Sequence, residues 1–449
     1  MRAVNRPIFF VIGSTGSGKS KVAVHLAHEL RRAYHYKDVV VINCDVYQCY
    51  TDLPILTNKP SAADLGGVTH VSLGFLNNDG SVNWDNYSSA EQQAFCHEAE
   101  VHLSGNSNFN VHSYERIVTS FIADFFQRHE DGAVIVCGGT CYYAQALIFA
   151  DSLVNESEPS TLSYLDSDEK GGLWERLNAV DAEAALRYHP NDCRRIKRLL
   201  EIYDATGQAP SSIFNARLPK LRFDSHALFI VWVRMERKAL DTLLNRRVDL
   251  MLQRGMLDEV RAFWLSSSGN LPHSGLSEAI GCKELSQYFS NCSSPLITSS
   301  DFERAITQIK SNTRRYARQQ ERWIQNRLLP LLHSSPLKES PTHFVQLWTE
   351  EGVDTLLCVQ RTLDALLMAS PVQPLATSLF PLKQQPALRM PVSQEKCEVC
   401  NALIYGRGQM EVHLKSKRHR YSVRRLALEK EHRERYGREL PSPKRKRNN

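Results

Sequence analysis

The sequence predicts an α/β protein whose core is a parallel, doubly wound sheet. Short apolar runs at residues 9–12, 39–42, 133–137 and 227–233 have the length and composition of buried parallel strands. Helical stretches separate these runs, which is how parallel strands are connected. The first run leads directly into a glycine-rich turn. Because ligands of such sheets bind beyond the carboxyl ends of the strands, we expect the functional residues at that edge.

The turn after the first strand, "GSTGSGKS", has the pattern of a phosphate-binding loop. Apolar residues recur at helical spacing from Val22 to Leu30, so a strand, a turn and a helix follow in the required order. Backbone N–H groups and the helix macrodipole then favour an anion at one point. We expect a diphosphate or triphosphate here, with Lys19 on its oxygens and Ser20 on Mg²⁺. The expected phosphate-binding residues are Gly13, Ser14, Thr15, Gly16, Ser17, Gly18, Lys19 and Ser20.

The chain is long enough for two or three domains, since 449 residues exceed one ordinary core. A polar, acidic segment interrupts the predicted core after its third strand, and five prolines between Pro371 and Pro391 indicate an extended linker. The expected boundaries are 1–150 and 221–335 for the two parts of the core, 151–220 for a helical insertion, 336–390 for an extension with the linker, 391–425 for a zinc finger and 426–449 for a basic tail. Within the extension we expect a strand near 343–348 and a helix near 353–368.

Several classes of protein are disfavoured by composition. No run of eighteen apolar residues exists, so we expect no membrane span. The phosphate loop begins too early for a cleaved signal peptide, and eleven cysteines in such a chain suggest a reducing compartment. We therefore expect a cytoplasmic protein. The run "KRKR" at 444–447 and an N-terminus without acidic residues before Glu29 leave nuclear and mitochondrial fractions open.

Positive charge is concentrated at the carboxyl terminus. The formal net charge is +6, and residues 391–449 hold 16 lysines and arginines against 7 acidic residues. A basic tail on a nearly neutral body indicates a module that binds a polyanion. A solvated tail without a partner remains the alternative.

The same region has the ligand spacing of a C2H2 zinc finger. Two thiolates and two imidazoles form a closed tetrahedral zinc site, and Ile404 and Met410 are placed to pack the small core of a ββα finger. The five residues between the two histidines resemble fingers of the matrin or U1 type, which are often associated with RNA. The expected zinc ligands are Cys397, Cys400, His413 and His419.

The phosphate loop alone leaves the reaction open. A kinase would need an acidic residue at the end of a core strand to position Mg²⁺. The run at 133–137 ends in Cys137 without a carboxylate, whereas the run at 39–42 leads to Asp45. An ATP-dependent kinase for a nucleotide or small metabolite therefore remains a second hypothesis.

Seven segments together carry a more specific resemblance. In order along the chain they are "GSTGSGKS", "INCDVYQCYTDLPILTNKP", "VIVCGGTCYYAQAL", "NDCRRIKRLLEIYDATGQAPS", "RRVDLMLQRGMLDEV", "SEAIGCKEL" and "NTRRYARQQERWIQNR". Over roughly residues 8–330 the chain resembles the tRNA dimethylallyltransferase (tRNA isopentenyltransferase) family, in its eukaryotic form with an appended finger. The resemblance implies transfer of a dimethylallyl group from dimethylallyl diphosphate to N6 of adenosine 37, beside the anticodon. The loop then holds a diphosphate leaving group, ATP need not take part, and we expect a monomer.

The chemistry implied by this resemblance assigns three catalytic residues. Adenine's exocyclic amine is a poor nucleophile, so a carboxylate must orient it and accept its proton. Asp45 matches the family's base, Thr140 a threonine near the reacting centre, and Arg247 a diphosphate-binding arginine. Without the resemblance Asp45 and Thr140 would be caps, and Arg247 a surface residue. The neighbouring Arg246 points about 100° away on a helix.

The resemblance also implies where the anticodon stem-loop binds. Asp45 and Gln48 match the base-contacting segment, and a basic segment meets the anticodon region; a solvated basic face is its alternative. The residues of that basic segment are Arg194, Arg195, Lys197 and Arg198. A further helix, at 304–327, is expected to bury Ile306, Ile309, Thr313 and Ala317 while Lys310, Arg314, Arg315, Arg318 and Arg322 line a groove for tRNA. A non-catalytic RNA-binding protein is a third hypothesis, disfavoured because Lys19, Asp45, Thr140 and Arg247 are all present.

Overall fold

The structure is a computed structural model in which two compact units are distinguished. The first unit contains Met1–Leu153 and Pro219–Leu382, and the second contains Val154–Leu218 and Lys383–Asn449. The residues that the structure describes are 4–85, 87–103, 109–153, 172–216, 218–269, 275–291, 299–334, 343–349, 355–367, 394–400, 403–405 and 409–436.

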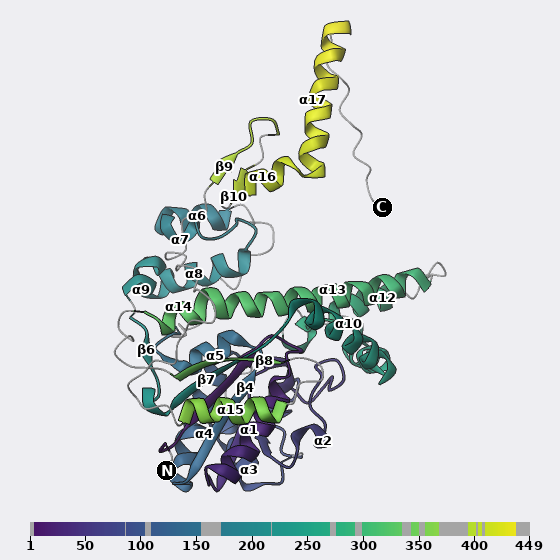
Figure 1. Ribbon diagram of the computed structural model, residues 1–449. Helices are drawn as coiled ribbons and strands as arrows, with labels where there is room; N and C mark the ends of the chain where they lie inside the picture. Colours follow the sequence, from purple (N-terminus) through teal and green to yellow (C-terminus); the bar gives the residue numbers. More distant parts are fainter. Residues whose placement is uncertain are drawn as a thin grey trace. The chain divides into compact units, whose positions relative to one another are not determined.

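A six-stranded parallel sheet forms the core of the first unit (Figure 1). Across the sheet the strands are β3 (Thr69–Val71), β2 (Asp38–Asn43), β4 (Gly132–Gly138), β1 (Ile8–Gly13), β7 (Leu228–Met235) and β8 (His343–Thr349). The strand before the phosphate loop is central, because Ile8 pairs with Val134 on one side and with Leu228 on the other. The predicted parallel α/β core is confirmed.

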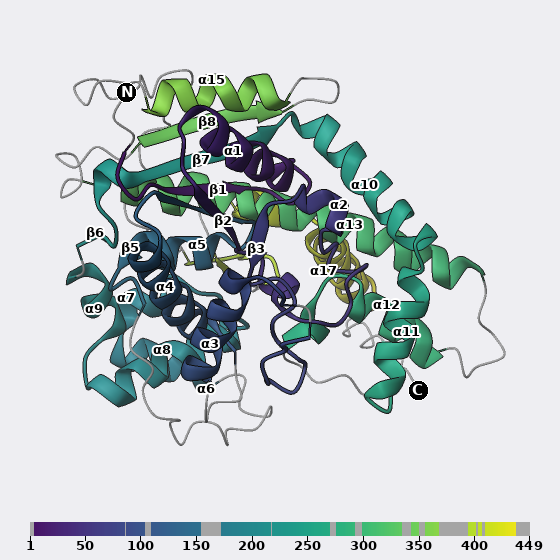
Figure 2. The same ribbon diagram turned by 90° about the horizontal axis from the view of Figure 1, so that it is seen from below.

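Both faces of the sheet are covered by helices, which explains the continuous apolar runs (Figure 2). One face packs on α1 (Lys19–Ala33) and α15 (Thr355–Leu367), and the other packs on α3 (Ala90–Leu103), α4 (Val111–Arg128) and α5 (Cys141–Ile148). Successive side chains of β1 point to opposite faces of the sheet. Phe9 and Val11 pack with residues of α1, whereas Phe10 and Ile12 belong to the cluster that contains α3, α4 and α5.

The second half of the first unit surrounds the long helix α13 (Ser299–Trp323). Ile306, Ile309 and Ala317 are buried on this helix as predicted, while Thr313 is half-buried and donates to the Ile309 carbonyl oxygen. The other helices of this unit are α2 (Ala62–Leu65), α10 (Arg237–Gln253), α11 (Met256–Ser266), α12 (Cys282–Asn291) and α14 (Leu329–Leu332).

Two strands of the core differ from the sequence-based expectation. β3 was not predicted, because three residues are too few for a recognisable pattern. The predicted strand near 343–348 is β8, and it pairs with β7 at the edge of the main sheet. With α15 packed on α1, these residues of the supposed 336–390 extension belong to the core.

The helical part of the second unit is a small cluster with its own apolar centre. Its helices are α6 (Gly172–Val180), α7 (Ala182–Ala185), α8 (Cys193–Thr206) and α9 (Pro210–Ala216). The helical insertion predicted at 151–220 therefore contains these separate, short helices. The buried Asp181 causes one break, because its carboxylate caps α7 at Ala184 N and also accepts from the backbone and hydroxyl of Ser211.

The carboxyl-terminal part of the second unit has the predicted ββα order. β9 (Gln394–Lys396) pairs with β10 (Leu403–Tyr405), and α16 (Gln409–Leu414) and α17 (Lys417–Tyr436) follow. The last helix extends past the expected end of the finger at residue 425.

Several predicted segments lie outside the described residues: residues 154–171 of the polar, acidic segment after the third strand, the prolines of the linker and the "KRKR" run at 444–447. Of the helices in the described part of the chain, none combines the length and the apolar character that crossing a membrane requires.

Candidate functional site

The phosphate loop connects β1 to α1 and depends on glycine at two close approaches. Gly13 has φ 154°, and a Cβ there would lie 2.3 Å from the Val233 carbonyl oxygen. Gly16 has φ 81°, and its Cβ would lie 2.7 Å from Leu244 Cδ2. Any side chain at these positions would push the loop away from β7 and α10.

Lys19 is oriented by the loop itself. Its Nζ donates to the Ser14 carbonyl oxygen at 2.7 Å, and burial lowers its pKa, although the negative charge of Asp45 opposes this shift. Ser17 is fully buried, and its hydroxyl oxygen has no hydrogen-bond partner among the described residues. Ser20 lies exposed in the first turn of α1. The predicted loop residues thus lie in one glycine-rich turn at the amino terminus of α1, where an anion-binding site is expected.

Asp45 follows β2 and begins a short 3₁₀ helix, η1 (Val46–Cys49). Asn43 fixes the backbone there: its Oδ1 accepts from Asp45 N at 3.2 Å, and its Nδ2 donates to Asp45 O at 3.0 Å. Burial raises the pKa of the Asp45 carboxyl group, and the positive charges of Lys19 and Arg247 oppose that rise. A carboxylate with a raised pKa is a stronger base than an exposed one.

Thr140 connects the turn after β4 to the Asp45 segment. Its hydroxyl oxygen accepts from Val46 N at 3.1 Å, and its own N–H donates to the Cys44 carbonyl oxygen at 3.1 Å. The Thr140 side chain makes no capping bond to α5, so the alternative role of helix cap is not observed. The two strand ends approach so closely that a Cβ on Gly138 would lie 2.0 Å from Cys44 O.

Arg247 reaches the phosphate loop from α10. Its Nη1 donates to Thr15 Oγ1 at 3.0 Å, and burial lowers its pKa while Asp45 raises it. Arg246, the next residue on the helix, is exposed. Lys19, Asp45 and Arg247 therefore act electrostatically on one another at the carboxyl edge of the sheet.

Two residues of α13 at this edge were not predicted as site residues. Gln320 is buried and bonds both the phosphate loop and the turn after β4. Burial raises the pKa of Tyr316, and Asp45 and Cys141 add to this rise. Both residues lie in the segment "NTRRYARQQERWIQNR". The available signal was that Tyr316 and Gln320, four residues apart on one helix, are uncharged among arginines.

The thiols around the site are inert near neutral pH. Burial raises the pKa of Cys137 to about 11 and that of Cys141 to about 12. Cys49, buried beside Asp45, has its pKa raised to about 12 for the same reason. Since the thiolate is the nucleophilic form, covalent cysteine catalysis is disfavoured here.

Gln48 has a local structural role in this structure. Its Nε2 donates to the carbonyl oxygens of Thr57 and Asn58, at 3.1 and 2.9 Å, and so holds the following loop. The Glu259 carboxylate fixes the same loop by accepting from Ile55 N and Leu56 N, both at 2.8 Å.

The predicted basic groove on α13 is partly occupied by protein partners. Lys310 pairs with Asp249 at 2.6 Å, and Arg318 with Asp241 at 3.6 Å. Arg314 donates to Asn245. These three cations hold α10 against α13, so they are less available to tRNA than expected. Arg322 is exposed, and Arg315 donates to Asn312 on its own helix.

The predicted basic segment of the second unit lies on α8. Arg194 and Arg195 are exposed, whereas Lys197 and Arg198 are half-buried. Local ion pairs hold two of the arginines, Arg195 to Asp192 at 2.9 Å and Arg198 to Glu201 at 3.1 Å. Each pair is partly exposed to solvent, so it contributes little to stability.

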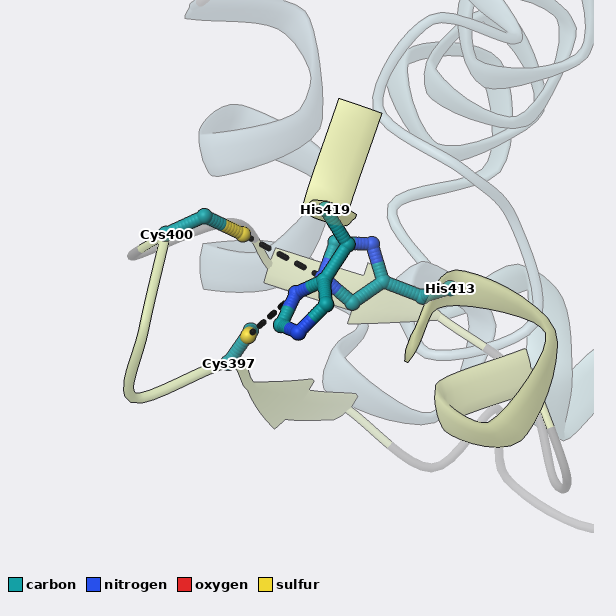
Figure 3. A group of neighbouring side chains, drawn as sticks. All are labelled: Cys397, Cys400, His413 and His419. Atoms are coloured by element: carbon teal, nitrogen blue, oxygen red, sulfur yellow. Dashed lines mark hydrogen bonds between the residues drawn. The ribbon is translucent and has the colours of Figure 1, made fainter. Parts of the chain in front are cut away.

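The four predicted zinc ligands gather at one point (Figure 3). Their ligand atoms all lie within 4.8 Å of one another, with Cys397 Sγ 3.5 Å from His419 Nδ1 and Cys400 Sγ 3.2 Å from His413 Nε2. These separations match the edges of a tetrahedron with zinc-ligand bonds of about 2.0–2.3 Å. Backbone N–H groups of Cys400 and Val399 lower the pKa of Cys397, which favours the thiolate that zinc requires.

Comparisons with known proteins agree with this geometry. A family model described as IPP transferase matches residues 85–327, and one described as zinc-finger of C2H2 type matches residues 396–419. The chain is 30% identical to a tRNA dimethylallyltransferase of Schizosaccharomyces pombe, covering 94% of this chain and 95% of that protein. It is 28% identical to the Homo sapiens tRNA dimethylallyltransferase, covering 92% and 85%.

A solved structure is similar along nearly the whole chain. It is that of a eukaryotic dimethylallyltransferase acting on tRNA, with 25% identity, a TM-score of 0.70, and coverage of 96% of this chain and 99% of that one. The family model spans more than half of the chain, and the fission-yeast relative is matched almost from end to end. The chain belongs to the IPP transferase family, among the tRNA dimethylallyltransferases, and carries a C-terminal C2H2 zinc finger.

Proposed function

We propose that the chain transfers a dimethylallyl group from dimethylallyl diphosphate to N6 of adenosine 37 in tRNA, releasing diphosphate. One observation carries this proposal. The positive charges of Lys19 and Arg247 act on the buried Asp45 carboxylate, yet no ion pair joins either cation to it among the described residues. We infer that the two cations are left to bind a diphosphate and that the carboxylate is left to accept a proton from the attacking amine.

Asp45 is the proposed general base. The adenine N6 attacks the allylic C1 carbon, the C1–O bond breaks, and the N6 proton passes to the Asp45 carboxylate. Thr140 supports this step indirectly, because its hydroxyl accepts from Val46 N and so orients the segment that carries Asp45. The proposed direct role of Thr140 is to contact the reacting centre from the same turn.

The phosphate loop is proposed to stabilise the departing diphosphate. Negative charge grows on its oxygens as the C1–O bond breaks, and preorganised donors stabilise developing charge most in a site with little water. Backbone N–H groups from Ser17 to Ser20 would supply fixed dipoles. Lys19 and Arg247 supply positive charge, and both are held by neutral oxygens of the loop rather than by acids.

Mg²⁺ is the proposed metal of the reaction. It would be held by the Ser20 hydroxyl and by diphosphate oxygens, which is the hard oxygen ligand set this ion prefers. The exposed position of Ser20 in the first turn of α1 fits this role. When bound, the ion would neutralise charge on the leaving group.

The second unit and Gln48 are proposed to bind tRNA. Gln48 lies in η1, directly after Asp45, and is proposed to contact the base. Arg194, Arg195, Lys197 and Arg198 on α8 would contact the anticodon stem-loop. The zinc finger would add a grip on RNA that depends little on sequence. We further propose a monomer that acts in the cytoplasm, with nuclear and mitochondrial fractions to be measured by fractionation.

One assay tests the reaction. Purified protein is incubated with radiolabelled dimethylallyl diphosphate and tRNA transcripts carrying A36-A37-A38, with an A37-to-G transcript as the control. Label in the first transcript alone is expected. Product formed only from labelled ATP would favour a kinase, and no product from either donor would favour a non-catalytic RNA-binding protein.

A further inference from the structure

Two loops of the site come from different strands and must keep a fixed separation. The phosphate loop follows β1 and holds the leaving group, while the turn from Gly138 to Thr140 follows β4 and orients the Asp45 segment. The strands pair directly, but their register ends at Ile12 and Gly138. Beyond that point, the spacing of the loops depends on side chains.

Gln320 spans the two loops from α13. Its Oε1 accepts from Thr15 N at 2.8 Å, and its Nε2 donates to the Gly139 carbonyl oxygen at 2.8 Å. These partners are 305 and 181 residues away in the sequence, and the Gln320 side chain is buried. A flipped amide would set donor against donor and acceptor against acceptor, so the chemistry allows one orientation.

The neighbouring residues are fitted to this amide. A Cβ on Gly139 would lie 2.5 Å from Gln320 Nε2, so only glycine leaves room for the amide to dock. Arg247 holds the same residue of the phosphate loop, because it donates to Thr15 Oγ1 at 3.0 Å.

We propose that Gln320 is a positioning residue that sets the distance between the departing diphosphate and the attacking amine. It touches neither substrate in this scheme. Its two bonds fix the leaving-group loop relative to the turn that orients Asp45, and misplacement by about 1 Å can cost about 100-fold in rate. This inference rests on the proposed dimethylallyl transfer.

The test compares variants in the full chain by single-turnover and steady-state transfer of labelled dimethylallyl to tRNA. Gln320→Met keeps the volume but loses both hydrogen bonds, and we expect kcat to fall about 10- to 100-fold. The Kd for tRNA should change less than twofold. Gln319→Met, on the exposed neighbouring position, should match the wild type.

Two further variants separate positioning from loss of stability. Ile309→Val removes a buried methylene from the same helix and should lower Tm without lowering kcat at temperatures well below Tm. Gln320→Glu keeps the acceptor for Thr15 but donates to Gly139 only when protonated. Its kcat relative to the wild type at the same pH should therefore rise as pH falls.

The outcomes are distinct. A wild-type protein that transfers no label would end the proposed function itself. If the wild type is active, any of three results would overturn the positioning role. Gln320→Met could keep full kcat, or Ile309→Val could lose as much kcat as Gln320→Met. The kcat of Gln320→Glu relative to the wild type could also stay constant as pH changes.

Discussion

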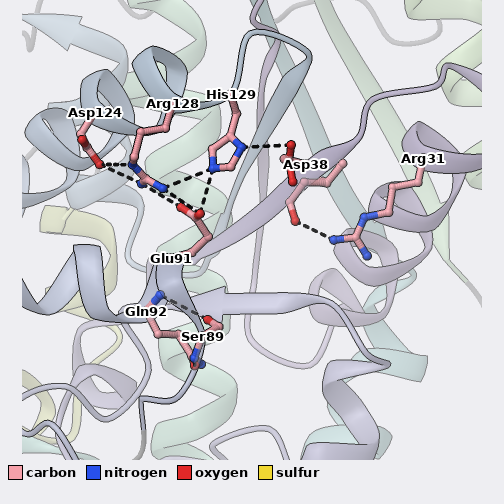
Figure 4. A network of polar contacts seen from close by, with 9 residues as sticks. Arg31, Asp38, Ser89, Glu91, Gln92, Asp124, Arg128 and His129 are labelled. Carbon is pink, nitrogen blue, oxygen red and sulfur yellow. Dashed lines mark hydrogen bonds and ion pairs between the residues drawn. The ribbon is translucent and has the colours of Figure 1, made fainter.

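Charged side chains form ion pairs at one end of the central sheet but not at the other. At the amino end, Glu91 pairs with Arg128 at 2.8 Å and with His129 at 2.9 Å, and His129 also meets Asp38 at 3.0 Å (Figure 4). Asp124 completes the network by pairing with Arg128 at 2.8 Å. Each charge there has an opposite partner within the protein.

At the carboxyl end, the charges are oriented but left uncompensated. Lys19 and Arg247 donate to neutral oxygens of the phosphate loop, and the Asp45 carboxylate accepts from the backbone of Tyr47. Burial shifts the pKa of each of the three groups toward its neutral form. The difference is that paired charges stabilise one end of the sheet, whereas the other end keeps unpaired buried charges that the proposed function would use to bind its substrates, at some cost in stability.

Removal of the base should have the largest effect. Asp45→Asn keeps the side-chain volume but cannot accept the N6 proton, so we expect kcat to fall about 10³-fold. The Kd for tRNA, measured by filter binding, should stay within a few fold. Lost binding with unchanged kcat at saturating tRNA would mean that Asp45 holds RNA rather than a proton.

Removal of the diphosphate-binding arginine should come second. Arg247→Leu deletes a cation from the leaving-group site, and we expect transfer to fall about 100-fold. Arg246→Leu on the exposed side of α10 is the matched control and should keep full activity. Equal losses in both variants would point to a general role of charge on this helix.

The pH dependence of kcat/KM should report the pKa of Asp45 at the carboxyl end of the sheet. In the proposed mechanism the Asp45 carboxylate accepts a proton, and burial raises its pKa. We therefore expect kcat/KM to fall with decreasing pH at a value above the ordinary carboxyl pKa of about 3.9. Arg247 lowers the Asp45 pKa, and therefore Arg247→Leu should move this acid limb to higher pH. An unmoved limb would assign the titration to another group.

Loss of zinc should have a smaller effect, confined to RNA binding. Cys397→Ser removes one of four ligands, so the finger should unfold and the Kd for tRNA should rise about 10-fold. Turnover at saturating tRNA should stay within twofold of the wild type. Cys358→Ser, at a half-buried cysteine of α15, is the control. Unchanged affinity in Cys397→Ser would leave the finger without an RNA-binding role.

The smallest effect is expected at the amino end of the sheet. The folded pKa of Glu91 is lowered by Arg128 and His129, so its contribution to stability is present above about pH 4.3 and is lost as pH falls through the folded pKa. Glu91→Gln should lower the free energy of unfolding by about 1 kcal/mol at pH 7, a figure reduced for solvent screening. The difference should shrink in acid, and kcat should not change. A loss of kcat here would contradict the division between the two ends.

The sequence alone predicted four strands of the core, the glycine-rich turn and the zinc ligands. Continuous apolar runs identified four parallel strands because both faces of the sheet are buried. The spacing of "GSTGSGKS" predicted the turn between β1 and α1. The four zinc ligands followed from spacing as well, since a tetrahedral site imposes local geometry. Each of these features depends on residues close together in the chain, so it can be recognised from the sequence.

Only the tertiary structure decided how distant segments meet. Gln320 reaches Thr15 across 305 residues, β8 joins the sheet next to β7, and three cations of α13 bind α10 instead of facing a groove. No periodicity encodes such contacts, because each depends on where two separately folded elements come to lie. The bridge between the leaving-group loop and the base-bearing segment therefore becomes visible only when the chain is folded.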